Sequence, residues 1–138
     1  MVNPKILLAC VAILAAVSAQ PALSAAPQKF DTTVTLKVDM TPGRSAAPRG
    51  TFAWHGKVKS EKDECENKRF VGLWTIPEGG GSPVLRGKDL TGPDGKWLIP
   101  VEANYDGEYY AEAAKRTLGS GKICKLGRSE SYIRDIMP

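Results

Sequence analysis

The sequence predicts a small all-β protein, a β-sandwich or a small barrel, that leaves the cytoplasm and carries one disulfide bond. Apolar and polar residues alternate over several short stretches, and turn-forming residues separate these stretches at intervals of about ten residues. Two cysteines, Cys65 and Cys124, remain once the apolar N-terminus is set aside. Alternation of this kind is typical of strands that bury one face, so the pattern indicates packed sheets rather than helices.

Residues 1–25 have the three parts of a secretory signal peptide. A basic start is followed by an apolar run at residues 6–17, and small residues end the segment at Ala25. The apolar run is shorter than the ~20 residues that a membrane-spanning helix needs. We expect cleavage after Ala25, with Ala19 as the alternative, and a secreted or periplasmic protein without an integral membrane segment. Retention as a membrane anchor and lipidation of Cys10 are the competing interpretations.

The exported part has the size and charge of one ordinary domain. Removal of residues 1–25 leaves 138 − 25 = 113 residues, and basic residues then number 19 − 1 = 18 against 15 acidic ones, a net charge of +3. Because charges of both signs are interleaved rather than concentrated in a basic stripe, we expect no nucleic-acid partner. We place an N-terminal strand and a Pro/Gly-rich connector at residues 26–50 and the β-sandwich domain at residues 51–138.

Seven stretches of the exported part predict strands. In the first, Phe30, Val34, Leu36 and Val38 lie on one face of an alternating pattern. A loop rich in proline and glycine at residues 41–50 then separates this strand from the rest. The expected strands are residues 30–39, 52–58, 69–76, 84–91, 97–101, 108–114 and 123–136.

Turn signals bound the later strands. Pro77 ends the third strand, and residues 92–95, Gly-Pro-Asp-Gly, predict a tight turn before the fifth. Residues 104–107 form a similar turn before the sixth strand. We expect the last strand to bend near Gly127. The alanines at residues 112–115 add a mild helical propensity.

Cys65 and Cys124 are expected to form a disulfide, because an even number of cysteines in an oxidising compartment usually pairs. They are 124 − 65 = 59 positions apart, and closing a loop of that length stabilises a fold by about 4 kcal/mol. The alternative is a pair of free or metal-binding thiols. His55 is the only histidine, which leaves too few ligands for a zinc site.

Three local patterns resemble those of carboxypeptidase regulatory-like domains. Residues 91–97 are similar to a Thr-Asp-x-x-Gly-x-aromatic hairpin, although Gly92 stands where that motif has aspartate. Residues 106–111 resemble a Pro-x-Gly-x-Tyr segment that opens a later strand, and the stretch from Trp54 to Leu73 resembles the first hairpin.

The resemblance covers residues 51–136. It implies a seven-stranded transthyretin-like (prealbumin-like, Ig-like) sandwich with one disulfide, a version common in exported bacterial proteins. The superfamily serves as accessory, adhesive or ligand-binding modules and only rarely as enzymes. Such analogy concerns the fold and does not by itself fix a function.

No set of catalytic or metal-binding residues stands out. No Gly-x-Ser-x-Gly motif or free cysteine accompanies His55, which we expect to face solvent because its neighbour Trp54 faces the core. The acidic stretch at residues 61–66 is interrupted by lysine and lacks the ligand pattern of a calcium loop. The glycines at residues 79–81 lack the lysine of a phosphate-binding loop. We expect no enzymatic activity, no cofactor and no metal.

Basic residues and tyrosines late in the chain are the candidates for ligand binding. Tyr109 and Tyr110 must face opposite sides of a strand, so we expect at least one of them to be exposed. The basic residues could meet an anionic surface, or they could protect a sheet edge from aggregation. The candidate ligand-binding residues are Tyr105, Tyr110, Lys122, Lys125 and Arg128.

These observations favour a secreted, non-enzymatic β-sandwich module that binds an unknown partner at the cell surface or outside the cell. Two alternatives remain open. One is a small secreted hydrolase or inhibitor-like effector that uses surface carboxylates. The other is a transthyretin-like binder of small apolar ligands.

Overall fold

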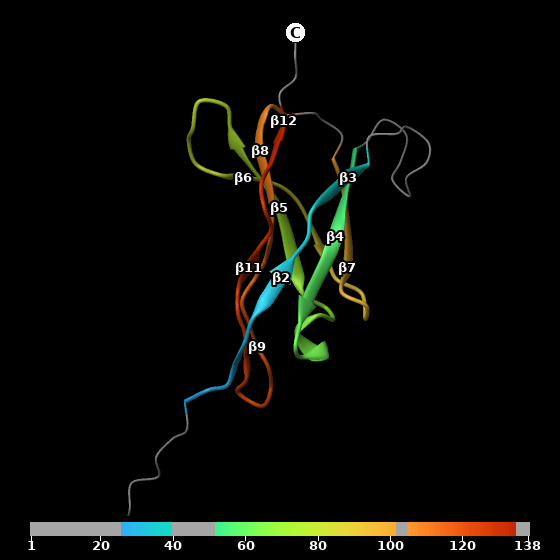
Figure 1. The fold of residues 1–138 in the computed structure, drawn as a ribbon, viewed down its shortest axis with the longest axis vertical. Helices are drawn as coiled ribbons and strands as arrows, with labels where there is room; N and C mark the ends of the chain where they lie inside the picture. Colours follow the sequence, from blue (N-terminus) through green and yellow to red (C-terminus); the bar gives the residue numbers. More distant parts are fainter. Residues whose placement is uncertain (1–25, 40–51, 102–104, 135–138) are drawn as a thin grey trace, which may run out of the picture.

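The computed structural model describes residues 26–39, 52–101 and 105–134. In these ranges the chain consists of strands and turns, with one short 3₁₀ helix and no α-helix. Two sheets pack face to face, and a small third sheet extends them at one end (Figure 1). The expected all-β architecture with one disulfide is confirmed. The expected signal peptide at residues 1–25 and the loop at residues 41–50 lie outside the described residues.

Twelve strands follow one another along the described chain, and several are only two or three residues long. The 3₁₀ helix η1 (Asp63–Cys65) lies between the fourth and fifth strands. The strands are β1 (Lys29–Phe30), β2 (Thr32–Val34), β3 (Lys37–Asp39), β4 (Phe52–Ser60), β5 (Phe70–Pro77), β6 (Val84–Leu90), β7 (Lys96–Val101), β8 (Gly107–Ala113), β9 (Arg116–Thr117), β10 (Ile123–Cys124), β11 (Gly127–Arg128) and β12 (Tyr132–Arg134).

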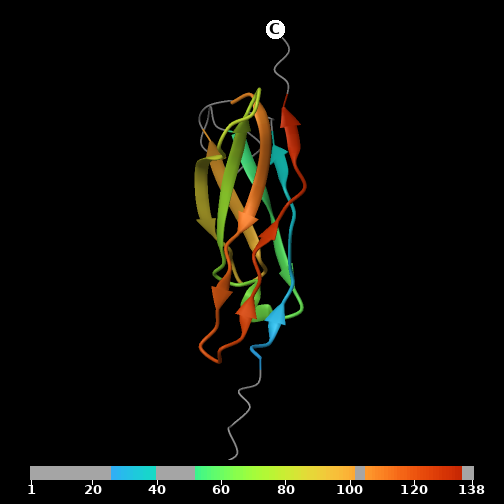
Figure 2. The same cartoon turned by 90° about the vertical axis from the view of Figure 1, so that its left-hand side faces the viewer.

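The larger sheet has the strand order β11–β8–β5–β6, and β12 pairs with β8 as well. The smaller sheet is centred on β4, with β2 and β3 along one side and β7 along the other. In the third sheet, β10 pairs in parallel with β1 and antiparallel with β9. Figure 2 shows the larger sheet facing the viewer, with the third sheet at its lower end. The N-terminal strands β1–β3 are thus paired with strands from the rest of the chain.

Side chains from both large sheets fill the space between them. Trp54 of β4 stacks on Tyr109 of β8 with ring centroids 4.2 Å apart, and Tyr132 of β12 meets Trp54 edge-on at 5.6 Å. Aromatic pairs of this kind contribute about 0.5–1.5 kcal/mol beyond the area they bury. The other buried members of this core are Val34, Val58, Val71, Leu73, Trp97, Ile99, Val101, Ala111 and Ala113.

The structure divides the chain into twelve strands where the sequence predicts seven. Two predicted strands change partners along their length and become three strands each, and the short strand β9 forms where the sequence predicts none. Within residues 30–39 the chain leaves β10 and then pairs with β4. Within residues 123–134, the described part of the last predicted strand, it leaves β1 and β9 and then pairs with β8. The mild helical propensity at residues 112–115 is overridden, since β8 runs through Ala113.

The turn at residues 92–95 forms as predicted but does not close a hairpin. Gly95 has a φ of 76°, a conformation that glycine adopts at little cost, and its N–H donates to the Gly92 carbonyl at 2.9 Å. This turn joins β6 of the larger sheet to β7 of the smaller one. The predicted hairpin is therefore wrong, and so is the one over residues 54–73, where β4 and β5 also belong to different sheets.

Cys65 and Cys124 form the predicted disulfide, with their Cα atoms 5.5 Å apart. The bond links η1 to β10, and both cysteines are fully buried. Phe30 and Leu118 pack against them in a second, smaller hydrophobic cluster. This cluster anchors the third sheet to the end of the sandwich.

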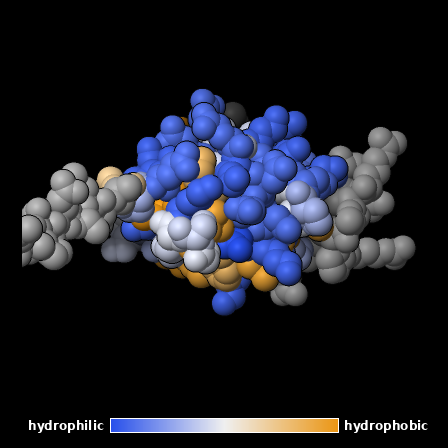
Figure 3. All heavy atoms as spheres, turned by 90° about the horizontal axis from the view of Figure 1, so that it is seen from below, coloured by the Kyte–Doolittle hydropathy of each residue, from blue (hydrophilic) through white to orange (hydrophobic). Residues whose placement is uncertain are grey.

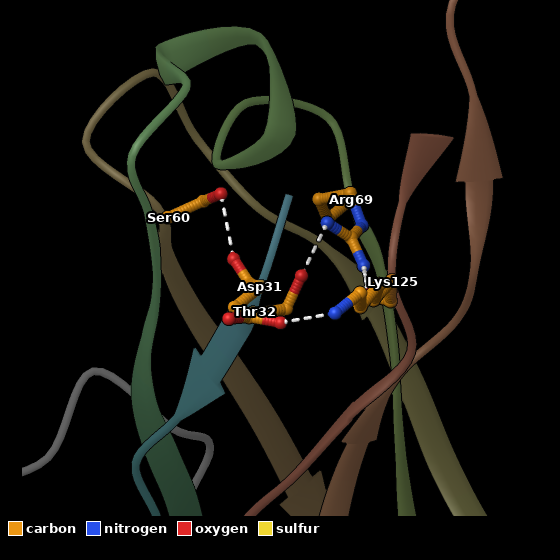
Figure 4. Close-up of polar contacts among 5 residues, drawn as sticks. All are labelled: Asp31, Thr32, Ser60, Arg69 and Lys125. Atoms are coloured by element: carbon orange, nitrogen blue, oxygen red, sulfur yellow. Dashed lines mark hydrogen bonds and ion pairs between the residues drawn. The ribbon is translucent and has the colours of Figure 1, made fainter. Parts of the chain in front are cut away.

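A fully buried arginine lies beside the disulfide. The Nη1 of Arg69 donates to the Cys65 carbonyl at 2.8 Å and to Thr32 Oγ1 at 3.2 Å. Its Nη2 donates to the carbonyls of Ala114 and Lys125 at 2.8 and 2.9 Å. Figure 4 shows the guanidinium between β2 and the segment that carries Lys125. One side chain thereby joins the two large sheets and η1.

The charge of Arg69 is stabilised by backbone dipoles instead of a carboxylate. Within the described residues, its guanidinium donates to three backbone carbonyls and one hydroxyl. Burial lowers the pKa of Arg69, and the positive charge of Arg116 lowers it further. Arginine nevertheless remains protonated in proteins, so the fold contains a permanent buried cation.

Reducing the disulfide should lower the free energy of unfolding by about 4 kcal/mol, because the unfolded chain regains the freedom of a loop that spans 59 positions. Chemical denaturation of the protein with and without reductant measures this difference. A Cys65→Ala/Cys124→Ala variant that is insensitive to reductant serves as the control. Equal midpoints for the oxidised and reduced protein would contradict the prediction.

Replacing Arg69 by methionine should lower the free energy of unfolding by about 3 kcal/mol or more, since it leaves buried carbonyls without donors. Denaturant titration measures the change. Lys115→Met removes the same charge from an exposed side chain and should stay within about 0.5 kcal/mol of the parent protein. If both variants are equally stable, Arg69 does not hold the sheets together.

Candidate functional site

Three of the basic residues late in the chain, Arg116, Lys122 and Lys125, lie on or beside the third sheet, where Arg116 pairs with Cys124. Lys125 pairs with Asp31, with Nζ and Oδ1 2.6 Å apart (Figure 4). Arg116 donates to the Asn67 carbonyl at 2.7 Å, next to η1. Lys122 lies in the loop before β10. Arg116 and Lys125 are thus each engaged by groups of the protein itself.

Tyr110 and Arg128 are the two candidate ligand-binding residues that the structure brings together. The guanidinium of Arg128 lies 3.4 Å from the centroid of the Tyr110 ring. Tyr105 lies elsewhere, with the guanidinium of Arg86 3.5 Å from its ring centroid. The expectation that Tyr109 or Tyr110 is exposed is wrong, since their exposed fractions are 1% and 4%. They do face opposite sides of β8, but Arg128 covers the outward one.

The outward surface of the larger sheet is apolar and aromatic. Val71 and Leu73 of β5 face the core, so the alternating residues Phe70 and Trp74 face outward. Strand pairing adds residues from β6, β8 and β12 beside them. We call this surface the outer aromatic face, and it consists of Phe70, Trp74, Ile76, Leu85, Leu90, Tyr110 and Ile133.

Four members of the outer aromatic face are large and well exposed. The exposed fractions are 42% for Phe70, 43% for Leu85, 57% for Leu90 and 70% for Ile133. Figure 3 views the molecule from below, where the surface is mostly hydrophilic and hydrophobic residues show along the lower edge of the picture and in a small area left of its centre. Apolar residues that lie together on a surface mark an interaction site more often than residues scattered singly.

Trp74 fills the space that a glycine leaves on this face. A Cβ on Gly72 would lie 2.8 Å from Trp74 Nε1 and 3.0 Å from Leu85 Cδ1. The absence of a side chain at Gly72 thus lets the indole lie close to the sheet. Of the three tryptophans, Trp54 and Trp97 belong to the core, whereas Trp74 lies on this outer face.

A row of charged residues crosses the outer aromatic face. Register places Arg128 opposite Glu112, Glu112 opposite Gly72, and Gly72 opposite Lys88. The Lys88 ammonium lies 5.4 Å from the centroid of the Phe70 ring. Cations over aromatic rings gain about 0.5–1 kcal/mol at exposed positions. The face therefore combines apolar area with charges of both signs.

The remaining candidate chemistry lies away from this face. His55 of β4 is half-buried on the smaller sheet, where its cross-strand neighbours are Lys37 and Leu98. In the acidic stretch, Glu66 accepts a hydrogen bond from the Ser60 N–H at 2.9 Å. Within the described ranges, no group of three or more His, Cys, Asp or Glu residues is arranged to hold a metal ion.

The same ranges contain no helix of sufficient length and hydrophobicity to cross a membrane. Comparisons with protein-family models, curated proteins and solved structures find no match for this chain.

Replacing Gly72 by alanine should push the Trp74 indole away from the sheet, because the new methyl group needs the space of Nε1. Quenching of tryptophan fluorescence by acrylamide should increase, since Trp54 and Trp97 are buried and Trp74 is the more accessible indole. Gly119→Ala, where nothing lies within 4 Å of the added Cβ, is the matched control. Unchanged quenching in Gly72→Ala would disprove this packing.

Proposed function

We propose that this chain is an exported, non-enzymatic binding module that docks on a protein partner through the outer aromatic face. The observation that carries the proposal is that exposed apolar side chains of β5, β6 and β12 share one sheet face. Leu90 and Ile133 are the most exposed of these, at 57% and 70%. Burying them against a partner would release about 25 cal/mol for each Å² of apolar area.

The composition of this face favours a protein partner. Tryptophan, tyrosine and arginine are the residue types that dominate binding energy in protein–protein interfaces. Here Trp74 is the cross-strand neighbour of the buried Tyr110, and Arg128, which covers the Tyr110 ring, is the exposed member of that stack. Glu112 and Lys88 supply the charged groups that fix the orientation of a partner.

The surroundings of His55 support the non-enzymatic part of the proposal. A histidine base in a nucleophilic triad needs a nucleophile on one side and an orienting group on the other. The cross-strand neighbours of His55 are a lysine, Lys37, and a leucine, Leu98. The disulfide supports export, since such bonds persist in oxidising compartments.

A transthyretin-like sandwich remains our proposal for the finer fold. Grouping consecutive short strands gives seven extended passages: β1–β3, β4, β5, β6, β7, β8–β9 and β10–β12. Most of this length lies in two packed sheets. Seven passages, grouped in this way, match the seven strands of the proposed sandwich.

A photo-crosslinking amino acid placed at Leu90 should capture a protein partner in cells that export this chain. The same group at Lys59, which is exposed on β4 of the other sheet, is the matched control. Trp74→Ala should weaken the Leu90 adduct, since loss of a central aromatic residue costs about 2 kcal/mol, roughly thirtyfold in affinity. Mass spectrometry identifies the adduct.

Equal labelling from Leu90 and Lys59, or an adduct that Trp74→Ala leaves unchanged, would contradict the proposal. An adduct with the mass of two chains would make the partner a second copy of this protein. Circular dichroism of each variant separates loss of binding from loss of folding.

A further inference from the structure

A second surface with the features of a binding site lies on the opposite sheet. The outward side of the smaller sheet holds a depression of about 450 Å³. This volume falls in the range of roughly 300–1,000 Å³ that is typical of small-molecule sites. Residues that line it include Thr35, Lys37, His55, Asp89, Lys96 and Leu98.

Strand register places two lysines opposite each other beside this depression. Because Trp54 faces the core, the alternating residues His55 and Lys57 face outward. Lys96 lies directly opposite Lys57, and Lys37 lies directly opposite His55. Side chains in such positions have Cβ atoms roughly 4.5–5.5 Å apart, and like charges there destabilise a sheet.

Only part of this positive charge is balanced by ion pairs. Lys96 Nζ lies 3.4 Å from Asp94 Oδ2, in a pair whose side chains are both largely exposed. No ion pair involves Lys37 or Lys57 within the described part of the chain. Lys37 and Lys57 therefore have no carboxylate counterion among the described residues.

The carboxylate that lines the depression is already engaged by the backbone. Asp89 Oδ2 accepts the N–H of Leu98 at 2.9 Å, and Asp89 Oδ1 accepts the N–H of Leu90 at 2.8 Å. Its role is to hold β6 against β7, which belong to different sheets. Asp89 thus shapes the wall of the depression, and its oxygens are turned to the backbone.

We infer that this depression binds a small organic molecule through a phosphate group. A phosphate monoester carries a charge close to −2 at neutral pH. This charge matches two lysines without ion pairs: Lys37, which lines the depression, and Lys57, which lies beside it as the cross-strand neighbour of the lining residue Lys96. Lysine binds phosphate as a point charge. Leu98 and the methyl group of Thr35 supply apolar wall for the organic part. Ligand binding would offset the repulsion that strand pairing creates. This inference does not depend on the proposed docking of a protein at the outer aromatic face.

The test uses the oxidised, exported chain and phenyl phosphate as the probe. Titration followed by ¹H–¹⁵N NMR should give saturable shifts in β3, β4 and β7 and none around Lys115, an exposed lysine after β8. Inorganic phosphate and phenol are titrated separately. Phenyl phosphate should bind more tightly than either, and equal binding of inorganic phosphate would assign the site to the free ion.

Lys57→Gln should change two properties in opposite directions. Affinity for phenyl phosphate should fall about tenfold, because a charge-assisted contact is lost. The melting temperature without ligand at low salt should rise, because the like-charge pair with Lys96 is removed. Lys115→Gln is the matched control and should leave both properties unchanged.

An absence of saturable shifts in β3, β4 and β7 would overturn the inference. Unchanged affinity in Lys57→Gln would overturn it as well. Reduced affinity together with a raised melting temperature supports it, since a residue retained only for the fold would not destabilise that fold.

Discussion

The two large sheets are joined at one end by hydrogen bonds to a single buried cation. The guanidinium of Arg69 donates to carbonyls of η1, of the residue after β8 and of the link between β10 and β11. Apolar packing between sheets is non-directional and tolerates sliding. Hydrogen bonds from one fixed guanidinium do not tolerate such sliding. Arg69 therefore fixes the relative position of the two sheets at this end. The disulfide beside it holds the third sheet to the same point.

Part of this fold could be predicted from the sequence, because burial within a strand depends on local alternation. Phe30 and Val34 in the first passage, and Trp54 and Val58 in β4, face the core as their pattern indicates. The pairing of Cys65 with Cys124 followed from the count of cysteines. The partner of each strand could not be predicted, since a Gly-Pro-Asp-Gly turn fits a crossing between sheets as well as a hairpin.

Both candidate surfaces depend on which strands pair with each other, which the sequence did not reveal. Phe70 and Leu90 become neighbours only through the register of β5 and β6, which includes an irregularity between Leu73 and Trp74. Lys57 and Lys96 meet only because β4 pairs with β7. By contrast, Arg116 and Lys125, two of the basic residues late in the chain, bond within the protein and belong to neither face. Closeness in the sequence therefore did not predict which residues lie on the same surface. Cross-strand pairing determines the residues of both faces.

The interactions that join distant segments of the chain lie at one end of the molecule, so we expect its two ends to differ in stability. The disulfide, Arg69 and the Lys125–Asp31 pair all lie at the end where β9 and β10 are found. At the other end, β3 and β12 are three-residue strands at sheet edges, each paired on one side. Heat or a pulling force should therefore detach β3 and β12 first, while the cross-linked end remains closed. The two ends of the sandwich therefore differ in their resistance to unfolding.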